Sequence, residues 1–175
     1  MTPVRCVACL APASLRPRGL TLQNSSMRTF ADNSVLDECL NRLGRLEPST
    51  GSRWGRMTAH QMVCHLFDSF GVAAGTKYAS PASGPFQRTI LKWIALRTPF
   101  SWPHGVATRP EIEQGTGGTP PSDWAHDCEK LRNALLTFSA RSTFGIHPMF
   151  GHMSRSDWLV WGYRHVDHHF RQFGV

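Results

Sequence analysis

Apolar residues in this chain recur at three- and four-residue spacing over long stretches, whereas no stretch of useful length alternates apolar and polar residues. The first pattern places side chains on one face of an α-helix, and strict alternation is the pattern of a β-strand. The sequence therefore predicts an all-α protein. The predicted helices cover residues 33–46, 58–74, 86–96, 122–142 and 154 onward.

Capping residues mark where two of these helices begin. Thr58 is followed three residues later by Gln61, and Ser154 is followed by Asp157. In such a capping box the two side chains accept hydrogen bonds from backbone amides that the first helical turn leaves free. The pairs predict helix starts at Thr58 and Ser154.

The order of the predicted helices favours a four-helix bundle. Four main helices are expected, with the 86–96 helix and a long loop at 99–121 inserted between the second and the third. Bundles of this kind build metal sites from inward-facing side chains on neighbouring helices. Loops of this length inside a compact domain are often functional.

The length of 175 residues suits one domain. Residues 1–30, which include the Pro-, Ser- and Arg-rich start of the chain, are predicted to be a disordered or extended leader. Residues 31–175 are predicted to form the helical domain.

Charge and cysteine content limit the function classes. The formal net charge is +7, but Arg5, Arg16, Arg18 and Arg28 all precede the first acidic residue, Asp32. The rest of the chain has no clustered basic stripe, which argues against nucleic-acid binding. No run of eighteen apolar residues predicts a membrane span. Five cysteines without a disulfide framework indicate a cytoplasmic location, with organelle targeting by the basic leader left open.

Histidines in the last predicted helix indicate a metal site. His165 and His169 are four residues apart, so they lie on the same side of the helix, one turn apart. Both imidazoles can then reach one ion at about 2.0–2.1 Å, the usual Zn–N distance. His65, on the apolar face of the second predicted helix, is the candidate third ligand. Two alternatives stay open: His60 in place of His65, and His168 in place of His169.

Three further polar residues lie one turn from these histidines or beside them. Asp68 and Asp167 are candidates to orient the imidazoles as hydrogen-bond acceptors, the alternative being ordinary surface carboxylates. Gln172 is a candidate to hydrogen-bond a ligand histidine or a metal-bound water, the alternative being helix capping near the terminus.

Several residues could shape a pocket near such a site. Trp54, Trp158 and Trp161 either line a pocket or belong to the core, since aromatics at helical spacing serve both. Gly162, one turn before His165, leaves room for a ligand or for a close helix.

Three stretches of the chain resemble the DinB-like (YfiT-like) superfamily of metal-dependent enzymes. They are WGRMTAHQMVCH at 54–65, HPMFG at 147–151, and the segment 158–175 with its HVDHHFRQFGV ending. The resemblance runs from about Val35 to the C-terminus.

The resemblance implies a four-helix bundle with a divalent metal held by one histidine of the second helix and an HxxxH pair of the last. Those positions match His65, His165 and His169. The superfamily includes thiol-dependent S-transferases and isomerases, and its members often form homodimers. His147 matches a family motif, which suggests a place near the mouth of the site; a contact at the entry of the last helix is the alternative.

The resulting hypothesis is a metal-dependent enzyme with a three-histidine centre. The ion would be Zn, Ni, Fe or Mn, and a low-molecular-weight thiol is a candidate co-reactant. The expected activity is hydrolysis or thiol-dependent S-transfer on a small molecule, with His147 and Gln172 as possible catalytic contributors. The alternative is a non-catalytic metal-binding or helical interaction domain, in which a fourth ligand such as His60 or His147 closes the site.

Overall fold

The computed structural model of the protein describes residues 27–82 and 84–175. These residues form five α-helices and no strand beyond one isolated bridge between His147 and Gly151, which confirms the all-α prediction. The α-helices are α1 (Asn33–Leu43), α2 (Ala59–Ala74), α3 (Lys92–Arg97), α4 (Trp124–Ala140) and α5 (Arg155–Gln172). A π-helical turn, η1 (Gln87–Leu91), precedes α3, and a 3₁₀ turn, η2 (Pro110–Ile112), lies before α4.

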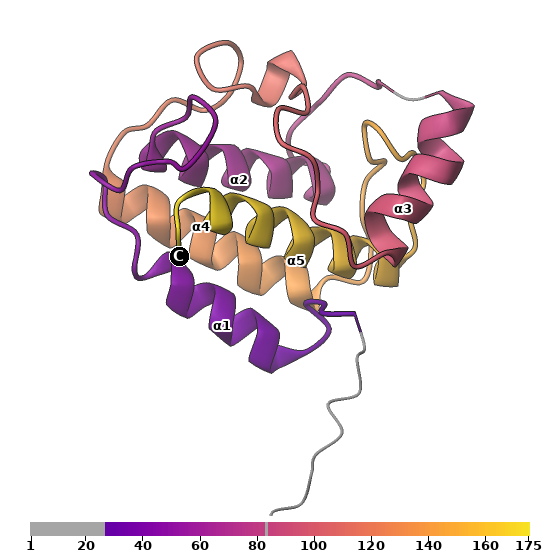
Figure 1. Cartoon of the computed structure of the whole chain (residues 1–175), viewed down its shortest axis with the longest axis horizontal. Helices are drawn as coiled ribbons and strands as arrows, with labels where there is room; N and C mark the ends of the chain where they lie inside the picture. Colours follow the sequence, from indigo (N-terminus) through magenta and orange to yellow (C-terminus); the bar gives the residue numbers. More distant parts are fainter. Residues whose placement is uncertain (1–26, 83) are drawn as a thin grey trace, which may run out of the picture.

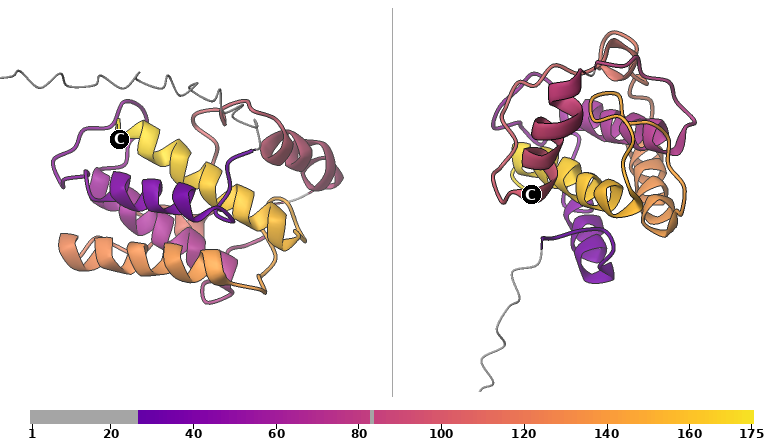
Figure 2. Two further views of the ribbon diagram at one scale, coloured as in Figure 1. Left: turned by 90° about the horizontal axis from the view of Figure 1, so that it is seen from below. Right: turned by 90° about the vertical axis from the view of Figure 1, so that its right-hand side faces the viewer.

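Four of the helices pack side by side as a bundle (Figure 1). Helix α2 packs on α4 and α5, and α1 covers α4 and α5 from the other side. The short α3 lies outside the bundle and packs against α5 (Figures 1 and 2). Bundle packing is therefore present, with the segment between α2 and α4 added at one side.

The helix starts follow the local capping chemistry. Both predicted capping boxes are present, Thr58 with Gln61 at α2 and Ser154 with Asp157 at α5. The other two bundle helices are capped by aspartates: Asp32 accepts from the amide of Ser34 at α1, and Asp123 from that of His126 at α4. Aspartate is a favoured residue at this position, because its carboxylate satisfies an amide that the first helical turn leaves free.

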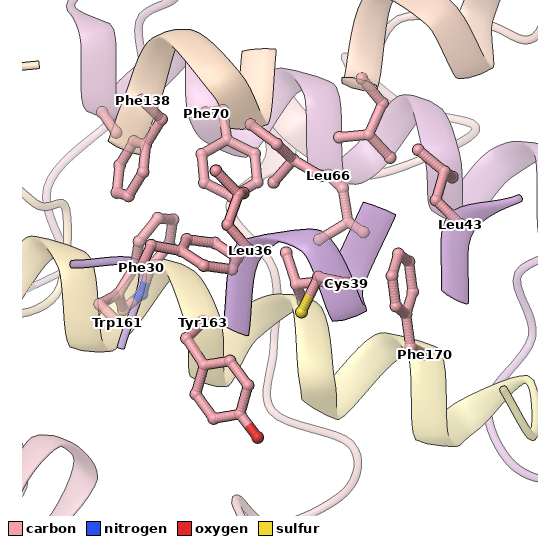
Figure 3. Close-up of a cluster of buried hydrophobic side chains, with 14 of the residues drawn as sticks. Phe30, Leu36, Cys39, Leu43, Leu66, Phe70, Phe138, Trp161, Tyr163 and Phe170 are labelled. Atoms are coloured by element: carbon pink, nitrogen blue, oxygen red, sulfur yellow. The ribbon is translucent and has the colours of Figure 1, made fainter. Parts of the chain in front are cut away.

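Aromatic side chains fill the middle of the bundle, as Figure 3 shows for the cluster around Phe70 and Phe138. Phe30, within the predicted leader, is 1% exposed and packs against Phe138, and its amide donates to the carbonyl of Leu159. Gly162 permits this packing, because a Cβ there would lie 2.5 Å from the Phe138 ring. The missing side chain at Gly162 therefore makes room for the rings of Phe138 and Phe30, as expected for close helix packing.

The segment inserted between α2 and α4 is fixed to α5 by its backbone. Arg164 of α5 donates hydrogen bonds to the carbonyls of Thr98 and Phe100, and the indole of Trp102 donates to the carbonyl of Ala95 at 3.0 Å. The predicted 86–96 helix is present but divided into η1 and α3. The predicted 99–121 loop is interrupted only by η2, whose Ile112 reaches α2.

Within the described residues, no helix combines the length and the apolar character needed to cross a bilayer. Of the predicted leader, residues 1–26 lie outside the described residues.

Candidate metal centre

His65, His165 and His169 come together where α2 faces α5. One ring nitrogen from each lies within 4.8 Å of the others. The ring centroids are 5.4 Å apart for His65 and His165, 5.0 Å for His65 and His169, and 4.9 Å for His165 and His169. His65 and His169 are buried, and His165 is partly exposed. The bundle thus joins residues 100 positions apart in the sequence.

The tautomer of His65 is set by the loop that carries η2. Its Nδ1 lies 3.1 Å from the carbonyl oxygen of Ile112. A carbonyl only accepts, so Nδ1 carries the proton and donates. In the neutral ring Nε2 then has a free lone pair, the form in which histidine binds metals.

The tautomer of His169 is set in the same way by Gln172. The Gln172 side-chain amide donates to the carbonyl of Trp54 at 2.7 Å, so its oxygen is turned to the other side. That oxygen lies 2.9 Å from Nδ1 of His169 and accepts from it. Nε2 of His169 therefore also keeps its lone pair. Gln172 hence orients a candidate ligand, and the loop that contains Trp54 holds Gln172 in place.

His165 completes the group without an orienting partner. Its Nε2 lies 3.2 Å from Nε2 of His169, and its buried Nδ1 has no hydrogen-bond partner within the described part of the chain. Two nitrogens at about 2.0–2.1 Å from one ion with a tetrahedral angle would be about 3.3 Å apart. The observed separation therefore fits two ligands on one ion, and the donor set of three imidazoles suits Zn, Ni or Fe.

Burial keeps the three imidazoles neutral. It lowers the pKa of His65, and it lowers the pKa values of His165 and His169 still further, since each also lies beside other histidines. Metal ions compete with protons for the same lone pair. A low imidazole pKa therefore leaves the nitrogens available to a cation at neutral pH.

Comparison with known proteins gives one match. A family model described as "Protein of unknown function (DUF1569)" matches residues 26–174. The chain belongs to this family. No curated protein and no solved structure matches it significantly. The DUF1569 match spans the whole bundle and all three histidines of the centre.

Neither alternative ligand, His60 or His168, belongs to the three-histidine group of this DUF1569 chain. His60 joins Cys64 and Asp127 in a second group, with its Nε2 2.9 Å from Asp127. His168 is next to His169, with ring centroids 5.2 Å apart, but its nitrogens do not join the three-histidine group. Among the described residues, no fourth His, Cys, Asp or Glu belongs to that group.

His147 holds the turn that leads into α5. Its Nδ1 accepts hydrogen bonds from the amides of Met149 and Phe150 at 3.1 and 3.0 Å, and its ring stacks on Phe150. Burial lowers the pKa of His147 to about 3. These contacts support the helix-entry role. Trp161 separates His147 from the centre, since its ring lies 5.3 Å from His147 and 4.9 Å from His165.

Neither candidate carboxylate orients an imidazole, because both are engaged with other partners, and Asp68 is not the surface carboxylate of the alternative either. Asp68 is 1% exposed and accepts from the amide and hydroxyl of Thr119, with Lys77 at 2.7 Å. Asp167 pairs with Arg42 at 2.8 Å. Asp68 lies one turn after His65 and Asp167 lies between His165 and His169 in sequence, but they form ion pairs with Lys77 and Arg42 on other parts of the chain.

A cavity of about 730 Å³ lies next to the centre. Trp54 lines it as the sequence suggested, whereas Trp158 and Trp161 belong to the core. Trp102 and His104, both in the inserted loop, also line it. The Trp102 ring lies 6.0 Å from that of His165, and His104 stacks on Trp54 at 4.0 Å. No periodic signal marks a residue in an irregular loop, so sequence reasoning missed these two.

Proposed function

We propose that this DUF1569 protein is a metal-dependent enzyme that holds a divalent ion with His65, His165 and His169 and acts on a small molecule. One observation carries the proposal: three neutral imidazoles converge, and two of them have their other nitrogen held by an acceptor. A hydrogen-bonded second nitrogen is the usual arrangement of histidine ligands.

The donor set favours a catalytic over a structural site. Structural zinc sites are closed by four protein ligands, and catalytic ones use three and leave a position for water or substrate. Within the part of the chain that the structure describes, the group has three members, and the suggested fourth ligands His60 and His147 are engaged elsewhere. Bound there, a divalent ion supplies a Lewis acid that lowers the pKa of a coordinated water or small thiol. Hydrolysis and thiol-dependent transfer are the reaction classes that such a centre serves.

The protein's own residues have three tasks in this proposal. Ile112 and Gln172 hold two imidazoles in the metal-binding tautomer. The aromatic rings of Trp102 and Trp161 flank His165 and limit access of water to it. The neighbouring cavity is large enough for a small-molecule substrate, for which pockets of about 300–1,000 Å³ are usual.

The DinB-like resemblance supports the same reading. The bundle packing of α1, α2, α4 and α5 and the histidine pair on the last helix agree with what that superfamily implies. Membership in the superfamily is part of the proposal.

The test is an activity screen on metal-loaded protein. Small esters, amides and phosphate esters probe hydrolysis, and small thiols with an electrophilic acceptor probe transfer. We expect turnover that a chelator abolishes and that His169→Ala lacks. His126→Ala, which removes an exposed histidine of α4, serves as the matched control and should retain it. Turnover that survives both the chelator and His169→Ala would contradict the proposal, and bound metal without any turnover would favour the non-catalytic alternative.

A further inference from the structure

The cavity beside the metal centre is lined by many more cationic than anionic groups. One carboxylate, Asp167, lines it. Five arginines do so: Arg28, Arg53, Arg97, Arg164 and Arg171. They come from four separate parts of the chain, so the fold of the bundle and of the inserted segment brings these positive charges together.

Three of these arginines have carboxylate partners. Arg28 pairs with Glu38, Arg97 pairs with Asp157, and Arg171 lies 3.6 Å from Asp167. Asp167 is shared, because Arg42 lies 2.8 Å from it on the other side. These pairs neutralise one part of the lining and leave the rest of the positive charge uncompensated.

Arg53 and Arg164 make no ion pair among the described residues. Arg164 is the more unusual, because it is half-buried and its guanidinium lies 5.8 Å from the centroid of the Trp102 ring. Its hydrogen bonds go to neutral carbonyls, so a half-buried positive charge has no ion-pair partner within the described part of the chain. Such a charge is costly, and an anion bound in the cavity would offset that cost.

Flat aromatic rings form the other walls. Trp54 and His104 stack with an interplanar angle of 10°, and Trp102 lines the cavity as well. Phe100, also in the lining, is 69% exposed. Exposed aromatic surface around a concave site is typical of a site that binds another molecule.

Two contacts connect this cavity to the centre. The carbonyl of Trp54 holds Gln172, which in turn orients His169. The Trp102 ring lies 6.0 Å from that of His165. None of the three histidines lines the cavity itself, so a molecule against Trp102 would lie one aromatic ring away from His165.

We propose that this cavity binds a small organic anion, with its carboxylate or phosphate group held by Arg53 and Arg164 and its flat or apolar body against Trp54 and Trp102. Guanidinium groups bind both oxyanions through paired hydrogen bonds. The claim that this anion is the substrate of the enzyme rests on the proposed function. The claim that the cavity binds an anion does not depend on the metal.

The test measures binding of four probes by calorimetry at low ionic strength: acetate, inorganic phosphate, benzoate and phenyl phosphate. The proteins are wild type, Arg53→Gln, Arg164→Gln and, as the matched control, Arg132→Gln. Arg132 is an exposed arginine of α4, a helix that contributes nothing to the cavity. Arg53 is exposed, so its variant is expected to fold even where Arg164→Gln does not.

We expect at least one aromatic probe to bind more tightly than acetate and inorganic phosphate, and Arg53→Gln to weaken it about tenfold or more. Arg132→Gln should bind as wild type. The head group of the tighter aromatic probe then distinguishes a carboxylate from a phosphate ligand. Absence of binding, or equal loss in Arg53→Gln and Arg132→Gln, would overturn the proposal.

The His165→Ala/His169→Ala variant tests whether anion binding depends on the metal. We expect it to lose metal and keep anion binding. If anion binding is lost with the metal, the anion is held by the ion and the arginine site is wrong. If wild type binds the probes but no metal, the anion site stands and the proposed metal centre fails.

Discussion

Two groups of metal-capable side chains share helix α2 and differ in what already occupies their lone pairs. In the three-histidine centre, each ring has a nitrogen within 4.8 Å of a nitrogen on each of the other two rings, and no carboxylate or thiol among the described residues joins them. In the second group, His60 and Cys64 face Asp127, which already accepts hydrogen bonds from Ser122, Lys130 and His60. Proximity alone therefore does not distinguish a metal site.

The charge of Asp127 shows why the second group is a structural contact. Burial would raise the pKa of Asp127, but hydrogen bonds from Ser122, His60 and Lys130 outweigh it and hold the pKa below its usual range. Burial and the neighbouring Asp127 raise the pKa of the Cys64 thiol to about 12. A thiol binds metal as thiolate, so this cysteine is not prepared for coordination. Free, neutral nitrogens therefore mark a candidate metal site better than the number of nearby ligand atoms does.

The largest difference is expected between two alanine variants on the same helix. His65→Ala removes one of three metal ligands and should lower affinity for Zn²⁺ or Ni²⁺ by at least about a hundredfold, since loss of an outer hydrogen-bond partner alone costs about 10–100-fold. His60→Ala removes a histidine of the second group and should leave affinity unchanged. Calorimetric metal titrations of the two variants measure this. Equal loss in both would break the distinction between the groups.

The second group should affect stability instead. Asp127 is 3% exposed and joins Ser122, Lys130 and His60 at the start of α4. Asp127→Asn should lower the free energy of unfolding by about 2–4 kcal/mol, because hydrogen bonds to a buried charge are lost. Metal affinity should be retained.

Glu129→Gln is the control for this stability measurement. Glu129 is an exposed carboxylate on the same helix, and its variant should stay within about 0.5 kcal/mol of wild type in urea unfolding. A neutral result for Asp127→Asn would mean that the network does not stabilise the fold.

Gln172 tests whether orientation of the ligand matters. Gln172→Leu removes the acceptor that holds His169 and should weaken metal binding about 10–100-fold. Gln172→Glu keeps an acceptor oxygen at that position and should retain more affinity than the leucine variant. If the two variants bind metal equally, His169 does not need this hydrogen bond.

The smallest expected effect is a pH dependence of the metal-free protein. Burial lowers the pKa of His147 from its usual value to about 3, so the unfolded chain binds a proton first as the pH falls. Stability from this group is complete above about pH 6.5 and is lost below it, by about 1.4 kcal/mol at pH 5.5. The buried histidines of the centre act in the same direction.

The two groups should therefore respond to acid in different ranges. Because the pKa of Asp127 is lowered, its stabilisation persists at pH 5.5 and is lost only as the pH falls below the usual aspartate range. His147→Gln should flatten the dependence between pH 7.5 and 5.5 in urea unfolding. An unchanged slope would show that His147 is not buried as a neutral ring.

The histidine pair of α5 and the starts of α2 and α5 could be predicted from the sequence. Helical spacing placed His165 and His169 on one face, and capping boxes fixed the starts of α2 and α5, because each depends on residues within one turn. The contact of Gln172 with His169 is equally local.

Apart from the meeting of His65 with the histidine pair of α5, long-range contacts were not accessible from the sequence. Asp68 accepts a hydrogen bond from the amide of Thr119, 51 residues later. Trp102 and His104 line the cavity from an irregular loop. Such contacts depend on how the bundle closes, which neither periodicity nor spacing records.

The most direct test of the metal centre is elemental analysis of untagged protein purified without chelator or added metal, beside the His165→Ala/His169→Ala variant. We expect about one equivalent of a divalent metal in the wild type and none in a variant that circular dichroism shows to be folded. Wild-type protein that stays empty even when Zn²⁺, Ni²⁺ and Mn²⁺ are supplied would contradict the account.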